Sequence, residues 1–325
     1  LQTLCIKVIN RFCGKQMRSE EPKMLEYRAE GLCRNANTLT PEEWERCIAA
    51  GEVLQSTALA YDTDRCLRFE IAGHRARMPF AECVDTAPGE EIKDIAVLTR
   101  VGRPTCFIVT GSQRDENGEE IYLLSRAEAQ RQCKRQYLDT LEAGSVLPCT
   151  VTHIEGFGAF CDIGCGIAAL LPIDCLSVSR ISSPADRVRV GQQLLCAIKN
   201  RDAQGRIVLT LRELLGTWSE NAACFAPGET VVGIVRSVEE YGVFIEIAPN
   251  LAGLAEADPT LTPGQTVSVY IKNILPDKMK IKLVVVNKNL GQPLRFEPHY
   301  FVTRGRIKKW IYSTPQSRKQ IETVF

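Results

Sequence analysis

The chain has 325 residues, with 40 Lys or Arg against 39 Asp or Glu, which gives a formal charge of +1 at pH 7. This length suffices for two or three domains with separate cores, and the near-neutral charge excludes a strongly basic surface over the whole molecule, although local basic clusters exist. No apolar run approaches the length of a membrane span, and no signal-peptide pattern with a small-residue cleavage site is clear.

The chain contains fourteen cysteines but only three histidines, His74, His153 and His299. No Cys-x-x-Cys occurs, so we expect no metal site. Several cysteines stand where a strand favours Val or Ala, and a free Cys buries well as a small apolar side chain. Because disulfides need a secretory context that this chain lacks, we expect reduced, mostly core cysteines and a cytoplasmic protein.

Residues 1–38 are interpreted as an N-terminal extension. The chain begins with Leu1, whereas Met17 and Met24 both suit a natural start, so residues 1–16 are expected to come from upstream translation. Thr40-Pro41-Glu42-Glu43 then combines a capping box with proline at the first helical position, which predicts a helix to about Ala50.

Residues 39–126 are interpreted as this helix followed by a degenerate copy of a β-barrel that recurs later in the chain. The expected strands are residues 53–61, 66–71, 75–79, 95–101 with 105–110, and 121–124, with a hairpin turn at Asp115-Glu116-Asn117-Gly118. This copy lacks the aromatic residues of the later copies: Arg65 and Arg68 stand in their places, and Glu119 and Glu120 follow the turn. It is interpreted either as a docking module or as a spacer retained for stability.

Residues 127–143 are expected to form a linker helix. Ser125-Arg126-Ala127-Glu128 is a second capping box and predicts a helix to about Glu142. The segment carries few acids against four cations, Arg126, Arg131, Lys134 and Arg135. These cations indicate either a solvated helix face or a ridge that tracks phosphates between barrels.

Residues 144–212 contain the first of two matching strand-turn-strand units, with a tight turn at Glu155-Gly156. Phe157 and Phe160 flank two small residues, which leave the ring faces uncovered and suit a surface on which flat bases stack. The same pattern also fits ordinary core side chains of an antiparallel sheet.

A polar hairpin turn at residues 200–206 places the cation Arg206 at the start of a strand. A cation beside aromatic rings suits single-stranded nucleic acid, because the charge binds phosphate and the rings bind bases. His153 and Lys199, on neighbouring strands, are weaker candidates for the edge of the same groove. The connection before the hairpin carries loop arginines that are either solvated or extend the binding face, namely Arg180, Arg187 and Arg189.

The strand-turn-strand frame recurs 84 residues later, where Tyr241 and Phe244 replace the two phenylalanines. Self-similarity at a long period indicates duplicated structural units. We therefore expect a second, shortened barrel over residues 227–287. A helical linker over residues 213–226 joins the two barrels, and Trp218 within it is expected to pack under the neighbouring barrel.

Residues 288–325 are interpreted as a basic, aromatic hairpin and helix. Arg304-Gly305-Arg306 lies between two strand-like runs, and Ser313-Thr314-Pro315 is expected to cap a short helix. The aromatic residues here form either a further nucleic-acid surface or a cover for the last barrel; they are Tyr300, Phe301, Trp310 and Tyr312.

The combined frame resembles the RNA-binding repeat of ribosomal protein S1. The likeness rests on Phe-Gly-Ala-Phe, a glycine-rich turn before Leu-Leu-Pro-Ile, a Gly-Gln pair and Asp-x-x-Gly-Arg-Ile-Val-Leu-Thr. It covers residues 144–212 well and 228–286 moderately. The resemblance implies a mainly β protein of tandem OB-fold, S1-type five-stranded β-barrels joined by α-helical connectors.

The resemblance also implies which residues contact RNA. The matching positions are Phe157, Phe160, Asp202 and Arg206 in the better copy, and Tyr241, Phe244 and Lys280 in the later copy. A histidine that is usual in the third strand of the family is Pro172 in one copy and Glu256 in the other. Because an acid near a phosphate path is repulsive, we expect the later copy to bind more weakly or to recognise something else.

No phosphate-binding glycine loop, Gly-x-Ser-x-Gly elbow or His-Glu-x-x-His motif occurs, so we expect no catalytic residue, no enzyme and no cofactor. The sequence predicts a protein that binds single-stranded RNA, expected to be mRNA, in translation, with the 30S ribosomal subunit as a further partner and no membrane. The alternative is a protein-docking adaptor whose barrels bind a ribosomal or RNA-degradation partner. The near-neutral charge and the missing histidine favour that alternative.

Overall fold

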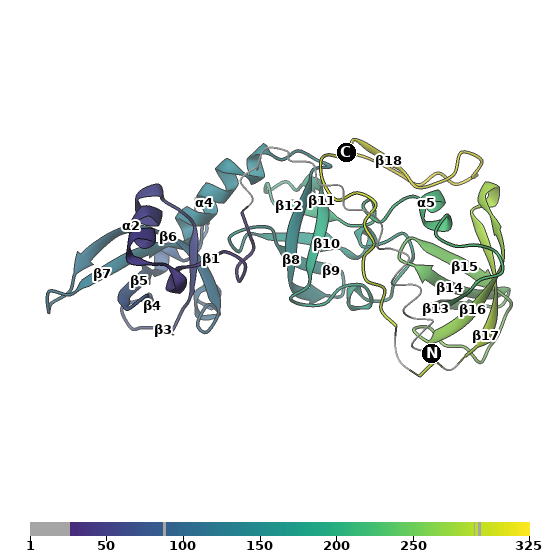
Figure 1. The fold of residues 1–325 in the computed structure, drawn as a ribbon, viewed down its shortest axis with the longest axis horizontal. Coiled ribbons are helices and arrows are strands. Elements are labelled where there is room, and N and C mark those ends of the chain that lie inside the picture. Colours follow the sequence, from purple (N-terminus) through teal and green to yellow (C-terminus); the bar gives the residue numbers. More distant parts are fainter. Residues whose placement is uncertain (1–26, 87–88, 289, 292–293) are drawn as a thin grey trace.

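The computed structural model describes residues 27–86, 89–288, 290–291 and 294–325. Three β units follow one another along the long axis of the molecule in chain order (Figure 1). The C-terminal segment, drawn in yellow, runs back from the third unit along the second. The expectation about residues 1–16 lies outside the described residues.

The first unit is a seven-stranded sheet with the order β1-β2-β6-β7-β5-β4-β3. Its strands are β1 (Arg34–Asn35), β2 (Leu54–Thr57), β3 (Ala60–Tyr61), β4 (Cys66–Ile71), β5 (His74–Pro79), β6 (Pro104–Arg114) and β7 (Glu120–Ser125). The short strands β2 and β3 follow each other in the chain but pair with different neighbours, β6 and β4. The expected degenerate barrel is therefore an open sheet, because its first strand is broken between Thr57 and Ala60.

Two helices accompany this sheet. The predicted capping box is confirmed: the Thr40 side chain accepts a hydrogen bond from the backbone of Glu43 and starts α2 (Pro41–Ala50), which ends at the left-handed Gly51. The strand expected at residues 95–101 is wrong, because residues 94–98 form α3 (Asp94–Leu98). Val97 is buried there while Ile95 and Leu98 are exposed. A short apolar run fits either structure by periodicity alone.

The linker helix α4 (Arg126–Gln136) begins as predicted at Ser125, whose side chain accepts from the backbone of Glu128. It ends six residues before the expected end, since the backbone of Tyr137 leaves the helical region and its ring is buried. The four cations of the helix all bind acids. Arg126 is buried against Glu30, and the other three pair with Glu128 or Asp85. Arg126 is thus a core residue, whereas Arg131, Lys134 and Arg135 remain 40–61% exposed in surface ion pairs, which fits the solvated face.

The second and third units are closed five-stranded barrels, as the sequence predicts. The middle barrel consists of β8 (Val146–Glu155), β9 (Gly158–Asp162), β10 (Ala168–Pro172), β11 (Gln193–Arg201) and β12 (Ile207–Thr210). The third barrel consists of β13 (Thr230–Glu239), β14 (Gly242–Ala248), β15 (Leu251–Ala255), β16 (Thr266–Leu275) and β17 (Lys280–Asn287). Both share the strand order in which the third strand runs parallel to the fifth.

Each unit has its own apolar core, built from alternate residues of the strands. The middle core includes Cys149, Cys161 and Cys196, on three different strands. Every cysteine that the structure describes is free, and all of these except Cys33 and Cys224 are buried. The expectation of unpaired, mostly core cysteines is confirmed for the described residues.

The connector between the two barrels contains α5 (Trp218–Ala222), which is shorter than expected. Trp218 is buried in the core of the third barrel, as predicted. Single-turn 3-10 helices cover other connections, at Ala36–Thr38, Phe80–Glu82, Leu138–Thr140, Ile173–Cys175, Pro184–Asp186 and Pro276–Lys278. No helix in the described ranges is long and apolar enough to cross a membrane.

The C-terminal segment differs from the predicted hairpin and helix. Its strands β18 (Lys309–Ile311) and β19 (Glu322–Val324) pair with each other across residues 312–321, which are not helical. Trp310 and Tyr312 are buried on the core of the third barrel, and the Tyr300 hydroxyl accepts from the backbone of Leu195 in β11. Trp310 and Tyr312 therefore fit the cover of the last barrel, because a buried ring offers no face to a base, whereas the half-buried Tyr300 packs against the middle barrel instead.

Candidate nucleic-acid interface

The hairpin of β8 and β9 positions the first aromatic pair. Phe157 lies in its turn and is 57% exposed, and Phe160 is half-buried on β9. Between them Gly158 lets β9 approach β10 closely, because a Cβ there would lie 2.6 Å from the carbonyl oxygen of Leu171. The two rings therefore stand on the outside of the barrel and are not sealed in its core.

The rings of this hairpin contact one another at defined angles. Phe157 meets Phe160 edge to face, with centroids 6.1 Å apart and planes at 89°. His153 of β8 lies nearly parallel to Phe160, at 6.4 Å and 25°, and its Nε2 is 2.7 Å from Glu155. Edge-to-face and offset-parallel packing are the favoured arrangements of aromatic rings. The packing fixes the ring of Phe160 while Phe157 keeps an open face.

The register of the barrel places Phe160 in a row that crosses all five strands. Its members in order across the sheet are His153, Phe160, Leu170, Val208 and Asn200. All five side chains are exposed or half-buried, whereas their neighbours in β9, β10 and β12 are mostly buried. We call this set the middle row; it forms an outer face with aromatic rings at one end and an amide at the other.

The predicted polar residues of the β11–β12 turn lie at the far side of that face. Asp202 accepts hydrogen bonds from the backbone of Gln204 and Arg206, and its side chain pairs with Arg206 at 2.7 Å. The Arg206 side chain is 72% exposed, and its hydrogen bond holds the pKa of Asp202 below its ordinary value. Arg206 is therefore a largely exposed cation on an ordered turn, where its guanidinium donates to Asp202 and Gln204.

Arg206 does not stand beside the rings. It precedes Val208 by two residues, which places it level with Ala168, whereas Phe157 lies past Gly158 in the other direction along the strands. Phe157 and the Arg206 guanidinium thus lie on opposite sides of the middle row, to which Phe160 belongs. Lys199 sits at a β-bulge of β11, where its ammonium contacts the Cys175 sulfur and lies 3.9 Å from Asp174.

The third barrel repeats this arrangement with different side chains. Tyr241 is 70% exposed and meets Phe244 edge to face at 6.2 Å. The equivalent row, which we call the third row, contains Ser237, Phe244, Leu254, Lys282 and Asn273. Lys280 precedes Lys282 at the position equivalent to Arg206. The exposed Glu256 follows β15, on the side of the row where Tyr241 lies.

Two cations of this face were missed by sequence reasoning. Lys282 stands where the middle row has Val208, and Lys272 occupies the bulge of β16 that corresponds to Lys199. Both are exposed. The alternation Lys280-Ile281-Lys282-Leu283 could have revealed Lys282, since every second residue of a strand faces the same side. Lys272 gave no such pattern, because a bulge interrupts the period of two.

The first unit carries no comparable row. Arg68 stands at the place of Phe160, as the alignment of the sequence implies, and it binds Asp62 and Asp64. The guanidinium of Arg65 lies 3.9 Å from the centre of the Phe80 ring and pairs with Asp94. Local acids and a ring therefore occupy Arg65 and Arg68.

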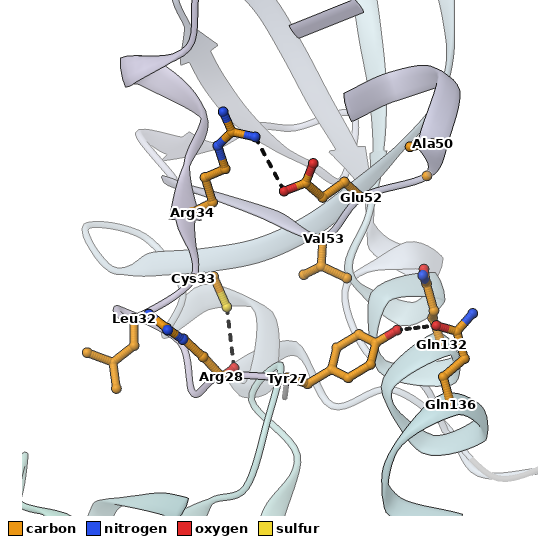
Figure 2. A pocket seen from close by; sticks show the side chains of 11 residues that line it. Tyr27, Arg28, Leu32, Cys33, Arg34, Ala50, Glu52, Val53, Gln132 and Gln136 are labelled. Carbon is orange, nitrogen blue, oxygen red and sulfur yellow. Dashed lines mark hydrogen bonds and ion pairs between the residues drawn. The ribbon is translucent and has the colours of Figure 1, made fainter. Parts of the chain in front are cut away.

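A cavity of about 750 Å³ lies between α4, the end of α2 and the segment that follows Tyr27 (Figure 2). Its polar groups are paired with each other: the Tyr27 hydroxyl donates to Gln136 at 2.6 Å, and Arg34 lies 3.5 Å from Glu52. Across the described part of the chain, no group of three or more His, Cys, Asp or Glu is arranged to hold a metal ion. The outer faces of the two barrels remain the candidate site.

Comparison with known proteins gives matches that include the middle barrel. Residues 140–212 match the S1 RNA binding domain. The small ribosomal subunit protein bS1 homolog of Bacillus subtilis is 32% identical over 198 residues, which cover 56% of this chain and 51% of that protein. Small ribosomal subunit protein bS1 of Staphylococcus haemolyticus is 33% identical over 166 residues, covering 47% and 42%. The chain thus spans about half the length of these relatives.

Among solved structures, a multidomain protein with nucleic acid binding domains from Streptococcus pneumoniae aligns over 74% of this chain and 75% of its own, with 14% identity and a TM-score of 0.26. A score this low adds nothing to the assignment, which rests on the sequence matches and on the barrels themselves. Residues 140–212, which contain the middle barrel, thus match the S1 RNA binding domain, and the chain is similar to small ribosomal subunit protein bS1 over about half of that protein's length.

Proposed function

We propose that the protein binds single-stranded RNA through the outer face of its middle barrel, in translation. The observation that carries the proposal is the exposed Phe157 ring set against Phe160 on a closed barrel that matches the S1 RNA-binding domain. Stacking on such rings suits any base, because every base has a flat face. The protein is accordingly a binding protein rather than an enzyme.

The geometry suggests a role for each residue of the middle barrel. One base stacks on the open face of Phe157, and a second lies over Phe160 beside His153. The backbone then crosses the apolar centre of the middle row toward Arg206, which pairs with a phosphate while Asp202 holds its guanidinium in place. Lys199 is a weaker contact, because the Cys175 sulfur and Asp174 already occupy its ammonium.

The cellular setting is proposed from the relatives. Proteins named as small ribosomal subunit protein bS1 match about half their length to this chain. We infer that the RNA is mRNA, that the 30S subunit is a partner and that the protein acts in the cytoplasm. The first unit, in which Arg65 and Arg68 are bound by its own acids, is proposed to serve as a docking module or spacer rather than as an RNA site.

The proposal is tested by fluorescence anisotropy with a labelled, unstructured RNA oligomer. The double variant F157A/F160A should weaken binding by about 2–4 kcal/mol if two bases stack. Leu59→Ala is the matched control, since Leu59 is also 57% exposed but lies in the first unit. Unchanged affinity in a folded F157A/F160A variant would remove the rings from the mechanism.

The docking alternative predicts a different pattern. Binding to RNA releases counterions and weakens as salt rises, whereas a protein contact through the barrels depends on salt only slightly. A partner that stays bound after nuclease treatment, together with RNA affinity that is negligible at about 50 mM salt, would favour the adaptor over RNA binding.

A further inference from the structure

The two rows differ at one position in a way that changes their charge. Between the aromatic residue and the asparagine, the middle row has Leu170 and Val208, while the third row has Leu254 and Lys282. Lys282 lies two strands from Phe244, or about 10 Å at the usual strand spacing. The third barrel thus carries a cation within the row itself, whereas the middle barrel has its arginine two residues beyond the row.

Two more lysines surround Lys282. Lys280 lies two residues away on the same face of β17, or about 7 Å along the strand. Lys272 occupies the bulge of β16, next to Asn273, which is paired with Lys282. Three exposed lysines of the two strands therefore occupy neighbouring register positions, and we call them the lysine cluster: Lys272, Lys280 and Lys282.

The lysine cluster is not neutralised by the protein. In the middle barrel Arg206 pairs with Asp202, Arg201 lies 3.8 Å from Asp139, and Lys199 lies 3.9 Å from Asp174. By contrast, no ion pair formed among the described residues involves a member of the cluster, although the nearby Lys288 binds Asp258 at 2.6 Å. An unpaired cation can bind an anion without first giving up an internal partner.

The strands that carry the cluster are also more open than their counterparts. Tyr270 and Val284 form a pair beside it and are 39% and 42% exposed. The equivalent pair of the middle barrel, Ala197 and Thr210, is buried. The Thr210 hydroxyl there bonds Glu213 of the following connector. A ligand can therefore reach β16 and β17 over a length that the connector closes off in the middle barrel.

The position of Glu256 makes the two ends of this outer face differ in charge. It is one residue beyond Ala255, and β15 runs parallel to β17, so Glu256 lies level with Val284 and on the side away from Lys280. The acid at one end of the face repels a polyanion. The three unpaired cations at the other end attract it. Phosphates are favoured over the lysine cluster and disfavoured near Tyr241.

We propose that the lysine cluster is a phosphate-binding site of the third barrel, and that it holds the backbone of a single-stranded nucleic acid whose bases lie over Phe244 and Tyr241. This inference rests on the proposed function. It reverses the expectation that Glu256 makes the third barrel a weak binder, since the cluster supplies the cations that the missing family residues do not.

The test uses the salt dependence of binding by the full chain. Each phosphate contact on a single strand contributes about 0.7 to the slope of log Kobs against log salt. The triple variant K272A/K280A/K282A should therefore lower the magnitude of the slope by about 2. The matched control K134A/K288A/K309A removes the same charge from lysines that already bind acids, and its slope should stay close to that of the wild type.

An exchange of the two row residues sharpens the test. Lys282→Val gives the third row the middle-row residue and should lower the magnitude of the salt slope by about 0.7. Val208→Lys should raise that magnitude by about the same amount. Thermal unfolding confirms that each variant is folded.

The outcomes separate the two proposals. A wild-type chain that binds no single-stranded RNA refutes the proposed function and this inference together. A wild-type chain that binds RNA, loses affinity in F157A/F160A and keeps its full slope in K272A/K280A/K282A refutes this inference alone. That second result would assign the open face of β16 and β17 to a protein partner.

Discussion

The middle and third barrels share a strand order, a register and an edge-to-face aromatic pair, yet they differ in where their charges lie. The middle barrel pairs its cations with acids and packs a histidine against Phe160. In the part of the third barrel that the structure describes, the lysine cluster forms no ion pair, and Ser237 stands in place of that histidine. The same backbone thus offers one face suited to holding bases and another suited to holding phosphates.

The barrels also share a buried acid at equivalent places, Asp162 on β9 and Glu246 on β14. Each faces the preceding unit. Asp162 accepts hydrogen bonds from the backbone of Glu30, Gly164 and Gly166. Glu246 binds the side chains of Arg187 and Arg236. One repeat position therefore serves both junctions, by backbone donors in one case and by guanidinium groups in the other.

The largest expected effect concerns the junction between the barrels. Arg187 and Glu246 are both fully buried. Both sequence-based interpretations of Arg187, a solvated loop residue or part of the binding face, are therefore wrong. Glu246→Ala leaves the buried Arg187 without its ion-pair partner and leaves Arg236 only Asp186, at 3.5 Å, so it should lower the free energy of unfolding by about 3–5 kcal/mol. Urea denaturation measures it.

A second variant separates charge from packing at this junction. Replacing Arg187, Arg236 and Glu246 together by apolar residues of similar size should lower stability much less than Glu246→Ala, because no buried charge is left unpaired and only the partly exposed Asp186 loses a partner. If both variants lose the same free energy of unfolding, side-chain packing rather than charge pairing stabilises this junction.

The next effect is a pH dependence at the other junction. Burial and the nearby Glu30 carboxylate raise the pKa of Asp162 to about 6. A carboxyl group whose pKa is higher in the folded state binds more protons there, so its contribution to stability falls as pH rises from about 4 to about 6 and then stays constant. The change is on the order of 3 kcal/mol.

Asp162→Asn should remove this pH dependence, so the stability of the variant relative to the wild type should rise across the same interval. Asp139→Asn, at an exposed position, is the control. If the unfolding free energies of the wild type and D162N change in parallel from pH 4 to 7, the pH dependence does not come from Asp162.

Substitutions of the two hairpin glycines test whether both aromatic pairs depend on the same close approach of strands. A Cβ at Gly158 or Gly242 would lie 2.6 Å from a carbonyl oxygen of the next strand, that of Leu171 or Ala255. Each change to Ala should cost about 1–3 kcal/mol, since backbone must move to relieve the contact. Gly156→Ala is the control, because no atom lies within 4 Å of a Cβ there. Equal stability of all three variants would show that the strands can separate freely.

The smallest expected effect concerns the histidine. His153→Ser gives the middle row the residue of the third row and should weaken RNA binding by about 0.5–1 kcal/mol through loss of a packed ring. Ser237→His should strengthen it by a similar amount. Anisotropy measurements on both variants check the pair, and a change of the same sign in both would contradict this account of the difference.

Much of this architecture could be predicted from the sequence because it depends on neighbours along the chain. The capping box at Thr40 is a contact over three residues, and the turns at Gly156 and Gly205 follow from local polar and glycine patterns. The repeated frame identified both barrels and the four aromatic residues of their hairpins. Alternation of apolar residues placed the cores, including the buried cysteines.

Other features were decided only by the tertiary structure, since they depend on partners distant in the sequence. The register across β15 and β17 puts Lys282 in the row of Phe244, and the bulge of β16 places the exposed Lys272 next to Asn273, the strand partner of Lys282. Arg187 is buried only because Glu246 arrives from the next barrel. The C-terminal rings pack inward because two barrels meet there. The role of a charged side chain depends on its ion-pair partners and on its burial, and its neighbours in the sequence determine neither of these.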